Sequence, residues 1–351
     1  MEKAALTRER SSEFAGQIVD WVRGKGKILI VAHDNPDPDS LAAAYALRHL
    51  FLVQNGQEAT ITFGGIIGRG ENRIMVRELE IGYVPMDELD LDEFKVVCLV
   101  DTQPGTGNNS FPANRPVHIV IDHHPLRDTT NGVRWVDVRE GYGASATILF
   151  EYLLEHGVYV GTKLATILFY AIKSETQDLG REWSQADREA YLALVPLCNN
   201  RILYKITHPK VPQSYFSSHS RAICNALLYP GGVLVFNLFD IDNPDIVAEM
   251  ADFLLRMEDV SLVLGMGRYK TCGVMSLRTM DEKLAAGEVM QQVVGDLGTA
   301  GGHAMIAGGQ VKPVPEGTAA LRELEQKLTG RLQDALGLKR EKGRRLFGKC
   351  G

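Results

Sequence analysis

Seven acidic and histidine residues in the first half of the chain have the chemistry of metal ligands. They form three groups, namely His33, Asp37 and Asp39 within AHDNPDPDS, a single Asp101, and the run Asp122, His123 and His124. Carboxylate and imidazole groups together suit manganese and similar divalent metals. Burying such carboxylates is costly unless they are paired or coordinate a metal. These residue types therefore predict a metal site.

Each group directly follows a short apolar run that is typical of a β-strand. The runs are KILIVA (27–32), KVVCLV (95–100) and VHIVI (117–121), and ATITF (59–63) is a fourth run of the same kind. Such runs suit parallel strands that are buried on both faces. Because ligands of open α/β sheets bind outside the carboxyl ends of the strands, we expect the three groups to meet at one sheet edge.

Taken alone, each group also has a structural interpretation. Asp37 and Asp39 flank a proline and could form a solvated turn. Asp101 could cap a loop, and a pair of adjacent histidines could be structural. The convergence of all three groups on one edge favours the metal site over these separate interpretations.

Helical patterns alternate with these strands, which predicts an α/β fold. The expected helices cover 41–50, 143–156 and 162–173, and they imply a parallel sheet with helices on both faces. A smaller second α/β domain with a mixed sheet is expected near the C-terminus. Its predicted strands are 232–239 and 271–279, and its predicted helices are 244–257, 281–294 and a leucine-bearing helix from 320 to 338.

The motifs resemble those of the DHH phosphoesterases. The resemblance rests on HDNPDPDS (33–40), the lone Asp101 and the Asp-His-His run, and in the second half on VMSLRT (274–279) and TAGGHAMIAGG (299–309). The last two are similar to signatures of the DHH-associated C-terminal domain. That superfamily includes RecJ-type exonucleases, nanoRNA and pAp phosphatases, cyclic-dinucleotide phosphodiesterases and family II inorganic pyrophosphatases. The resemblance implies a catalytic domain over 1–199, a linker with a helix over 200–228, and a substrate-binding domain over 229–351.

The resemblance also implies two Mn²⁺ ions per chain, with Mg²⁺ or Co²⁺ as substitutes. The expected ligands are His33, Asp37 and Asp101 for one ion, and Asp39, Asp101 and His123 for the other. Asp101 would bridge the two ions as a catalytic residue. His124 would lie next to the scissile phosphate, as an orienting group or a proton donor.

The fourth family motif departs from the pattern in this chain. The family places an aspartate on the second metal, whereas AIKSETQDL has Glu175 at that position. Its extra methylene carries the carboxylate further from the backbone, and we expect Glu175 to act as a ligand. Asp178 is the alternative ligand. A second alternative is that the site has lost a ligand and the protein is a nucleotide-binding sensor without catalysis.

Five residues of the second half are expected to bind substrate. They are Ser276, Arg278, Gly301, Gly302 and His303. Strand alternation places Ser276 and Arg278 on one face, and a guanidinium can bind phosphate with two parallel hydrogen bonds. The two glycines would let the backbone approach an anion at a helix N-terminus, with His303 contacting the nucleotide.

Composition restricts the function further. The chain has 351 residues and a net charge of −6 from 38 basic and 44 acidic side chains. This acidity and the absence of added nucleic-acid modules argue against a processive RecJ-type exonuclease. The family II pyrophosphatases carry a basic Ser-Arg-Lys signature that this sequence lacks. The longest apolar stretch, 164–172, is far too short to cross a bilayer, and the N-terminus does not resemble a signal peptide.

We therefore expect a cytoplasmic manganese-dependent phosphohydrolase that acts on short nucleotides. The expected substrates are nanoRNA fragments, pAp, or both, and no membrane is involved. A cyclic-dinucleotide phosphodiesterase acting on c-di-AMP or pApA is the alternative enzyme. The leucine-bearing C-terminal helix could pack on its own domain or on a second copy, so a homodimer is left open.

Overall fold

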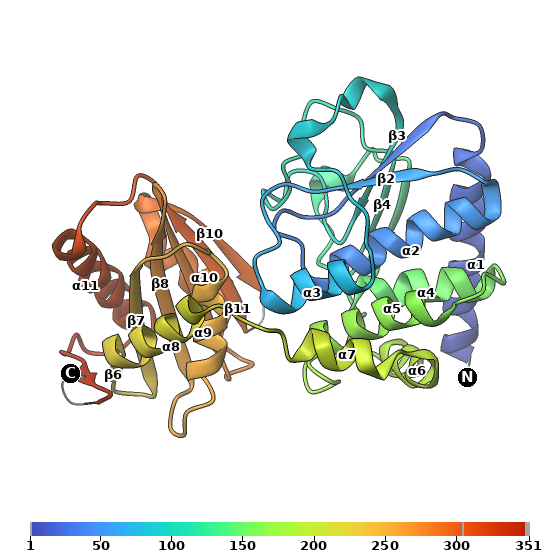
Figure 1. The fold of residues 1–351 in the computed structure, drawn as a ribbon. Helices are drawn as coiled ribbons and strands as arrows, with labels where there is room; N and C mark the ends of the chain where they lie inside the picture. Colours follow the sequence, from blue (N-terminus) through green and yellow to red (C-terminus); the bar gives the residue numbers. More distant parts are fainter. Residues whose placement is uncertain (1, 304, 348–351) are drawn as a thin grey trace. The chain divides into compact units, whose positions relative to one another are not determined.

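The computed structural model describes residues 2–303 and 305–347, without the side chains of residues 2–7 and 303. These residues divide into two compact units, 1–209 and 210–351 (Figure 1). No helix in this described part is both long and apolar enough to span a membrane.

The first unit contains a five-stranded parallel sheet with the order β2-β1-β3-β4-β5. The strands are β1 (Lys27–Val31), β2 (Ala59–Thr62), β3 (Phe94–Val100), β4 (Ile119–Asp122) and β5 (Trp135–Val138). The four predicted strands are confirmed. The fifth, β5, was not predicted from the sequence, because the buried Asp137 interrupts its apolar pattern.

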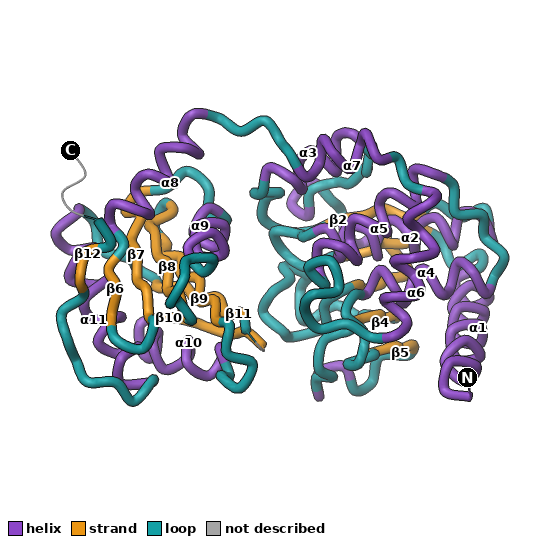
Figure 2. The backbone as a smooth tube through the Cα atoms, turned by 90° about the horizontal axis from the view of Figure 1, so that it is seen from below, coloured by secondary structure: helices purple, strands orange, loops and turns teal. Residues whose placement is uncertain are grey.

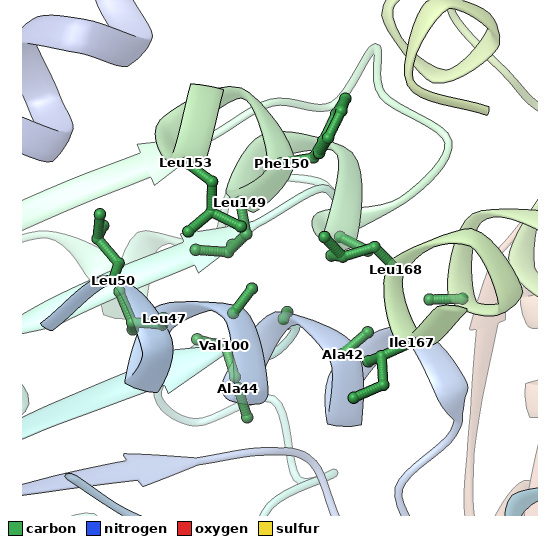
Figure 3. Close-up of a cluster of buried hydrophobic side chains, with 14 of the residues drawn as sticks. Ala42, Ala44, Leu47, Leu50, Val100, Leu149, Phe150, Leu153, Ile167 and Leu168 are labelled. Atoms are coloured by element: carbon green, nitrogen blue, oxygen red, sulfur yellow. The ribbon is translucent and has the colours of Figure 1, made fainter. Parts of the chain in front are cut away.

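Long helices cover one face of this sheet. They are α1 (Glu2–Val22), α2 (Pro38–Asn55), α4 (Ser145–Glu155) and α5 (Thr162–Glu175), and α3 (Gly70–Glu78), α6 (Gln185–Leu194) and α7 (Asn200–Thr207) complete the unit. Figure 3 shows where the helices meet: Leu47 of α2, Leu149 of α4 and Ile167 of α5 point toward a shared core. Each such leucine or isoleucine stabilises the fold by about 1.5–3 kcal/mol when fully buried.

The opposite face of the sheet packs on shorter elements. Leu29, Leu99 and Val120 face this side, where they meet the 3₁₀ helices Met86–Glu88 and Leu91–Glu93. The expectation of a parallel sheet with helices on both faces is therefore confirmed, with short helices on this second face.

The start of α2 shows how local sequence fixes one of these loops. Asp37 caps the helix, because its Oδ1 accepts the backbone N–H of Ser40 at 2.9 Å, and Pro38 occupies the first turn. The helix ends at Gly56, whose φ of 64° suits glycine. The cap holds the Asp37 carboxylate at the carboxyl end of β1.

The second unit contains a seven-stranded mixed sheet with the order β10-β11-β9-β8-β7-β6-β12. The strands are β6 (Leu227–Tyr229), β7 (Val233–Asp240), β8 (Leu262–Tyr269), β9 (Cys272–Thr279), β10 (Gly298–His303), β11 (Ile306–Val311) and β12 (Arg344–Arg345). Only β7 and β8 pair in parallel. The mixed sheet expected from the sequence is confirmed.

Helices cover both faces of this second sheet, as the tube in Figure 2 illustrates. They are α8 (Gln213–Asn225) and α9 (Ile246–Leu254) on one face, and α10 (Ala286–Val294) and α11 (Thr318–Ala335) on the other. Leu328 and Leu332 of α11 are buried against the α10 face of the sheet. Of the two predicted alternatives for the leucine-bearing helix, packing on its own domain is therefore the one observed.

The segment that joins the two units is shorter than the predicted linker of 200–228. Residues 200–207 form α7, which packs on α3 and α5 of the first unit, and residues 213–225 form α8, which packs on β7 and α9 of the second. The units divide between Pro209 and Lys210 rather than at 199 and 229. The prolines at 209 and 212 explain the break between the two helices.

Candidate metal centre

The loops after β1, β3 and β4 bring the three sequence groups together, with Asp101 at the centre. Asp101 directly follows β3, has a φ of 56° and is 1% exposed. The Nε2 atom of His33 lies 3.7 Å from Asp101 Oδ2 and 3.5 Å from Asp37 Oδ1. The predicted convergence at the carboxyl edge is therefore present for this group.

His123 joins the same cluster from β4. Its Nε2 atom lies 3.5 Å from Asp101 Oδ1 and 3.9 Å from Asp39 Oδ2. Two sets of three residues have possible ligand atoms within 4.8 Å of one another. The first set is His33, Asp37 and Asp101, and the second is Asp101, His123 and His124. Asp101 belongs to both sets.

Backbone carbonyls orient both histidines toward this centre. His33 Nδ1 lies 2.9 Å from the carbonyl oxygen of Asp34, and His123 Nδ1 lies 3.0 Å from that of Tyr142. A carbonyl oxygen can only accept, so Nδ1 is the donor in each ring. Each Nε2 atom then faces the carboxylates, which is the arrangement usual for histidine metal ligands.

The N-terminus of α4 holds two of the carboxylates. Both oxygens of the fully buried Asp39 accept backbone N–H groups, from Ser145 at 2.7 Å and Ala146 at 2.8 Å. The Ser145 hydroxyl donates to Asp101 Oδ1 at 2.9 Å. A helix N-terminus stabilises negative charge. The sequence analysis missed Ser145, although its place in the first turn of a predicted helix was a usable signal.

Asp122 positions His124 rather than facing the centre itself. Its Oδ1 atom lies 2.8 Å from His124 Nδ1, and its Oδ2 atom accepts from the Gln103 amide at 2.7 Å. Burial alone would raise the pKa of Asp122, but these hydrogen bonds and the nearby histidines lower it. His124 is the most exposed of the three histidines, with 30% of its side chain accessible, and its Nδ1 lies 3.7 Å from Asp101 Oδ1. Gln103 was also missed by the sequence analysis.

Glu175 is the last residue of α5, and the charges of the cluster affect its pKa. Burial, followed by the charge of Asp37, raises the pKa of Glu175 to about 7, and His123 opposes this shift. Asp178 points elsewhere, because it forms an ion pair with Lys173 and accepts a hydrogen bond from the Tyr191 hydroxyl at 2.9 Å. The charges that act on Glu175 and the contacts that occupy Asp178 thus favour Glu175 over Asp178 as the additional carboxylate.

The electrostatics of the cluster fit a bound divalent cation. Burial and the neighbouring carboxylates raise the pKa values of Asp39 and Asp101 well above their usual range. Burial lowers the pKa of His33, but the charges of Asp37 and Asp101 outweigh it and raise that pKa to about 10. The negative charge of the cluster therefore exceeds what its own side chains neutralise.

One atom shows most directly where a cation would be held. Within the described residues, His123 Nε2 is a buried nitrogen without a hydrogen-bond partner. Leaving such a group unsatisfied is costly, and a native structure that retains one needs a reason. Since Nε2 faces Asp101 and Asp39, a metal ion supplies that reason, and the donor set of imidazole and carboxylate fits it.

In the second unit, the expected alternation of β9 is present, but Arg278 does not face an open cleft. Met275 and Leu277 pack toward α10, whereas Arg278 lies on the α9 side and is 8% exposed. Its Nε atom donates to Asp252 of α9 at 2.7 Å, and its Nη1 atom donates to the Ser276 hydroxyl at 2.7 Å. Ser276 and Arg278 therefore share one face of β9 as predicted, and both are largely buried and hydrogen-bonded to each other.

Gly301 and Gly302 lie in the strand β10 rather than in a loop at a helix N-terminus. A side chain at Gly302 would approach the Ile306 carbonyl oxygen to 2.3 Å, and one at Gly287 of α10 would approach the Gly302 carbonyl oxygen to 2.4 Å. Gly302 is thus needed for the close approach of β10 to β11, and Gly287 for the close packing of α10 on β10. A side chain at Gly301 would meet open space. The side chain of His303 lies outside the described residues.

Comparisons with known proteins match both halves of the chain. Residues 27–172 match the DHH family, N-terminal domain, and residues 231–330 match the DHHA1 domain. An uncharacterized protein of Methanocaldococcus jannaschii is 32% identical over 323 residues, which cover 90% of this chain and 66% of that protein. A probable manganese-dependent inorganic pyrophosphatase of Deinococcus radiodurans is 29% identical over 174 residues, 48% of this chain and 54% of its own.

The fold is also found in a solved structure. An exopolyphosphatase-related protein from Bacteroides fragilis superposes with a TM-score of 0.74 over 92% of this chain and 98% of that one, at 14% sequence identity. The chain spans about two thirds of the length of the archaeal relative and about half of the pyrophosphatase.

Proposed function

The chain belongs to the DHH family of phosphoesterases and carries a DHHA1 domain in its second half, and from this premise we propose a manganese-dependent phosphohydrolase of short nucleotides. The proposed substrates are nanoRNA fragments, pAp, or both. The observation that carries the proposal is the meeting of His33, His123 and Asp101 at one sheet edge, with His123 Nε2 buried and unpartnered.

Two Mn²⁺ ions are the proposed cofactor. Their proposed ligands are His33, Asp37 and Asp101 for one ion, and Asp39, Asp101, His123 and Glu175 for the other. When bound, a pair of divalent cations lowers the pKa of a water molecule and stabilises the oxygen that leaves. The name of the Deinococcus radiodurans relative supports manganese as the metal.

The protein groups around this centre fix the ligands before substrate arrives. The backbone N–H groups of Ser145 and Ala146 restrict Asp39 to one orientation, and the Ser145 hydroxyl does the same for Asp101. The Tyr142 carbonyl keeps the His123 proton on Nδ1. A preorganised site of this kind loses little free energy to reorganisation during the reaction.

His124 is the proposed residue that contacts the scissile phosphate. Its Nδ1 atom is bound to Asp122, which directs Nε2 away from that carboxylate. In this proposal, Nε2 donates a hydrogen bond to the leaving oxygen of the ester and gives its proton to that oxygen as water attacks phosphorus and the ester P–O bond breaks. Gln103 secures the arrangement by holding the second oxygen of Asp122.

The second half of the chain supports a nucleotide over pyrophosphate as the substrate. The pyrophosphatase of Deinococcus radiodurans matches only 48% of this chain, whereas residues 231–330 match a DHHA1 domain. In β9, Ser276 and Arg278 remain the proposed substrate-binding residues, together with Gly301, Gly302 and His303. Arg278 would have to exchange part of its pairing with Asp252 for a substrate phosphate.

Hydrolysis of five compounds tests the proposal. The purified protein with Mn²⁺ is assayed on pAp, pApA, a five-nucleotide RNA, c-di-AMP and pyrophosphate, with Asp101→Ala as the control. We expect release of phosphate or mononucleotide from pAp or the RNA, and its loss in Asp101→Ala. Hydrolysis of c-di-AMP or pyrophosphate alone would assign another branch of the family, and nucleotide binding without any hydrolysis would indicate a sensor.

A further inference from the structure

A cavity of about 330 Å³ lies in the first unit beyond the carboxyl end of β2. Its walls come from the loop after β2, from α3 and from the segment before the first 3₁₀ helix. The residues that line it include Phe63, Ile66, Arg73, Arg77 and Tyr83. None of them belongs to the metal cluster. A volume of this size falls within the range of small-molecule sites.

The loop after β2, which lines the cavity, is hydrogen-bonded to the loop after β1, which carries His33 and Asp37. The backbone N–H of Gly64 donates to Asp34 Oδ1 at 3.0 Å, and that of Ile66 donates to Asn35 Oδ1 at 3.0 Å. A side chain at Gly64 would approach Asp34 Oδ1 to 2.3 Å, so glycine is required for the contact. Asp34 and Asn35 directly follow His33. Because β1 and β2 are parallel neighbours, the cavity and the metal cluster share one edge of the sheet.

Two aromatic rings form one wall of the cavity. The Phe63 and Tyr83 rings lie 4.5 Å apart between centroids and are tilted by 35°. Phe63 is buried at 3% exposure, whereas Tyr83 is 38% exposed. Ile66 adds a second exposed apolar surface, at 43%. An aromatic ring supported from behind and open in front is suited to stack a planar base.

Cationic side chains lie on the same cavity. Arg73 and Arg77 are one helical turn apart on α3, and both line it. The Arg73 guanidinium donates to the Gly68 carbonyl oxygen, and Arg77 Nη2 lies 3.0 Å from Glu78 Oε1. Glu78 is also paired with Lys205. Guanidinium groups beside an aromatic surface match a nucleotide, which joins a flat base to a phosphate.

We propose that this cavity binds a nucleobase of the substrate, stacked on Tyr83 beside Arg73 and Arg77, while the adjacent phosphate reaches the metal centre. The proposal rests on the proposed function and deepens it, because it places base recognition in the first unit. It explains how a short oligonucleotide binds to the first unit without base pairing. It also predicts that a substrate without a base at this position binds more weakly.

The test compares Tyr83→Ala with wild type on pApA and on two analogues that each lack one of the two bases. Base stacking on an aromatic side chain is typically worth about tenfold in affinity. We expect Tyr83→Ala to raise KM for pApA about tenfold with kcat little changed. For one abasic analogue, KM should already be raised in wild type, and Tyr83→Ala should add nothing further.

Matched variants separate stacking from a loss of structure. Tyr83→Phe retains the ring and should keep the wild-type KM. Tyr159→Ala removes another exposed tyrosine, 84% accessible and outside the cavity, and should also have no effect. Ile66→Ala provides a second perturbation of the cavity and should raise KM for pApA severalfold. Thermal unfolding of each variant verifies that it is folded.

The proposal is overturned if Tyr83→Ala matches Tyr159→Ala on pApA, or if it raises KM equally for all three substrates. Absence of hydrolysis by wild type would instead contradict the proposed function. The cavity is then tested by binding of a 2-aminopurine nucleotide in the presence of a chelator. Quenching of its fluorescence that disappears in Tyr83→Ala supports the cavity, and no quenching by wild type overturns it.

Discussion

The hydroxyl of Ser145 donates a hydrogen bond to Oδ1 of Asp101 over 2.9 Å, and both residues are almost fully buried. The same serine provides a backbone N–H to Asp39 at 2.7 Å. One residue at the start of α4 therefore orients two carboxylates of the cluster. Such outer contacts commonly change metal affinity by about 10- to 100-fold.

Ser145→Ala removes the hydroxyl but retains the backbone contact to Asp39. We expect the affinity for Mn²⁺ to fall about tenfold, because Asp101 loses a fixed orientation. Calorimetric titration of the metal-free protein with Mn²⁺ measures this change. Ser218→Ala is the matched control, since Ser218 is a buried serine of the second unit whose hydroxyl bonds within α8. An equal affinity in both variants would refute the role of Ser145.

His123 and His124 are adjacent in sequence, but we expect His123 to bind metal and His124 to donate a proton. His123→Ala should abolish binding of one Mn²⁺ ion, because it removes the nitrogen that faces Asp101 and Asp39. His124→Ala should retain metal binding and lower kcat by about 10²- to 10⁴-fold, the usual range for a lost general acid. Metal content and kcat measured on both variants provide the comparison. Loss of metal in both would make His124 a ligand rather than a proton donor.

Glu175 and Asp178 provide a second matched pair. Glu175→Gln should weaken Mn²⁺ binding, since it removes a carboxylate whose pKa is raised by burial and by the charge of Asp37. Asp178→Asn should leave Mn²⁺ affinity unchanged, because Asp178 bonds to Lys173 and Tyr191 instead. Titration of both variants with Mn²⁺ decides between them. The reverse order of effects would show that Asp178 is the ligand.

A buried ionic network stabilises the first unit away from the cluster. Arg139 is 5% exposed and donates to Asp137 and Glu151, while the Tyr152 hydroxyl donates to Asp137 at 2.5 Å. Arg139→Ala removes the buried cation and leaves Asp137 paired with the half-exposed Arg10, so we expect the free energy of unfolding to fall by about 3–5 kcal/mol. Urea denaturation measures this loss. Arg340→Ala, which removes an exposed ion pair with Asp334, should produce no resolvable change.

The sequence predicted the elements whose residues carry a strong local signal. The runs at 27–32 and 95–100 are rich in β-branched residues and apolar after their first lysine, and both form inner strands of the sheet. The glycine-rich segment 298–311 has no such pattern, yet it forms β10 and β11. These strands pair with each other and with β9, and α10 packs closely on β10 where Gly287 meets Gly302. Tertiary packing of this kind is not visible in local sequence.

The candidate site likewise contains residues that the local sequence predicts and residues whose roles depend on tertiary structure. His33, Asp37, Asp39, Asp101 and His123 were predicted, since all follow strands that end at the same sheet edge. Ser145 and Gln103 were not, because their partners lie 44 and 19 residues away and depend on loop geometry. Arg278 was expected to be open to a ligand, but alternation along a strand cannot reveal that Asp252 of α9 faces it.

The measurement that tests the central claim most directly is the number of Mn²⁺ ions bound per chain after equilibrium dialysis. We expect two ions for the wild-type protein and a loss of both in Asp101→Ala, because Asp101 belongs to both ligand sets. Ser218→Ala should retain two. One ion or none in the wild-type protein, or two ions in Asp101→Ala, would contradict the shared metal centre.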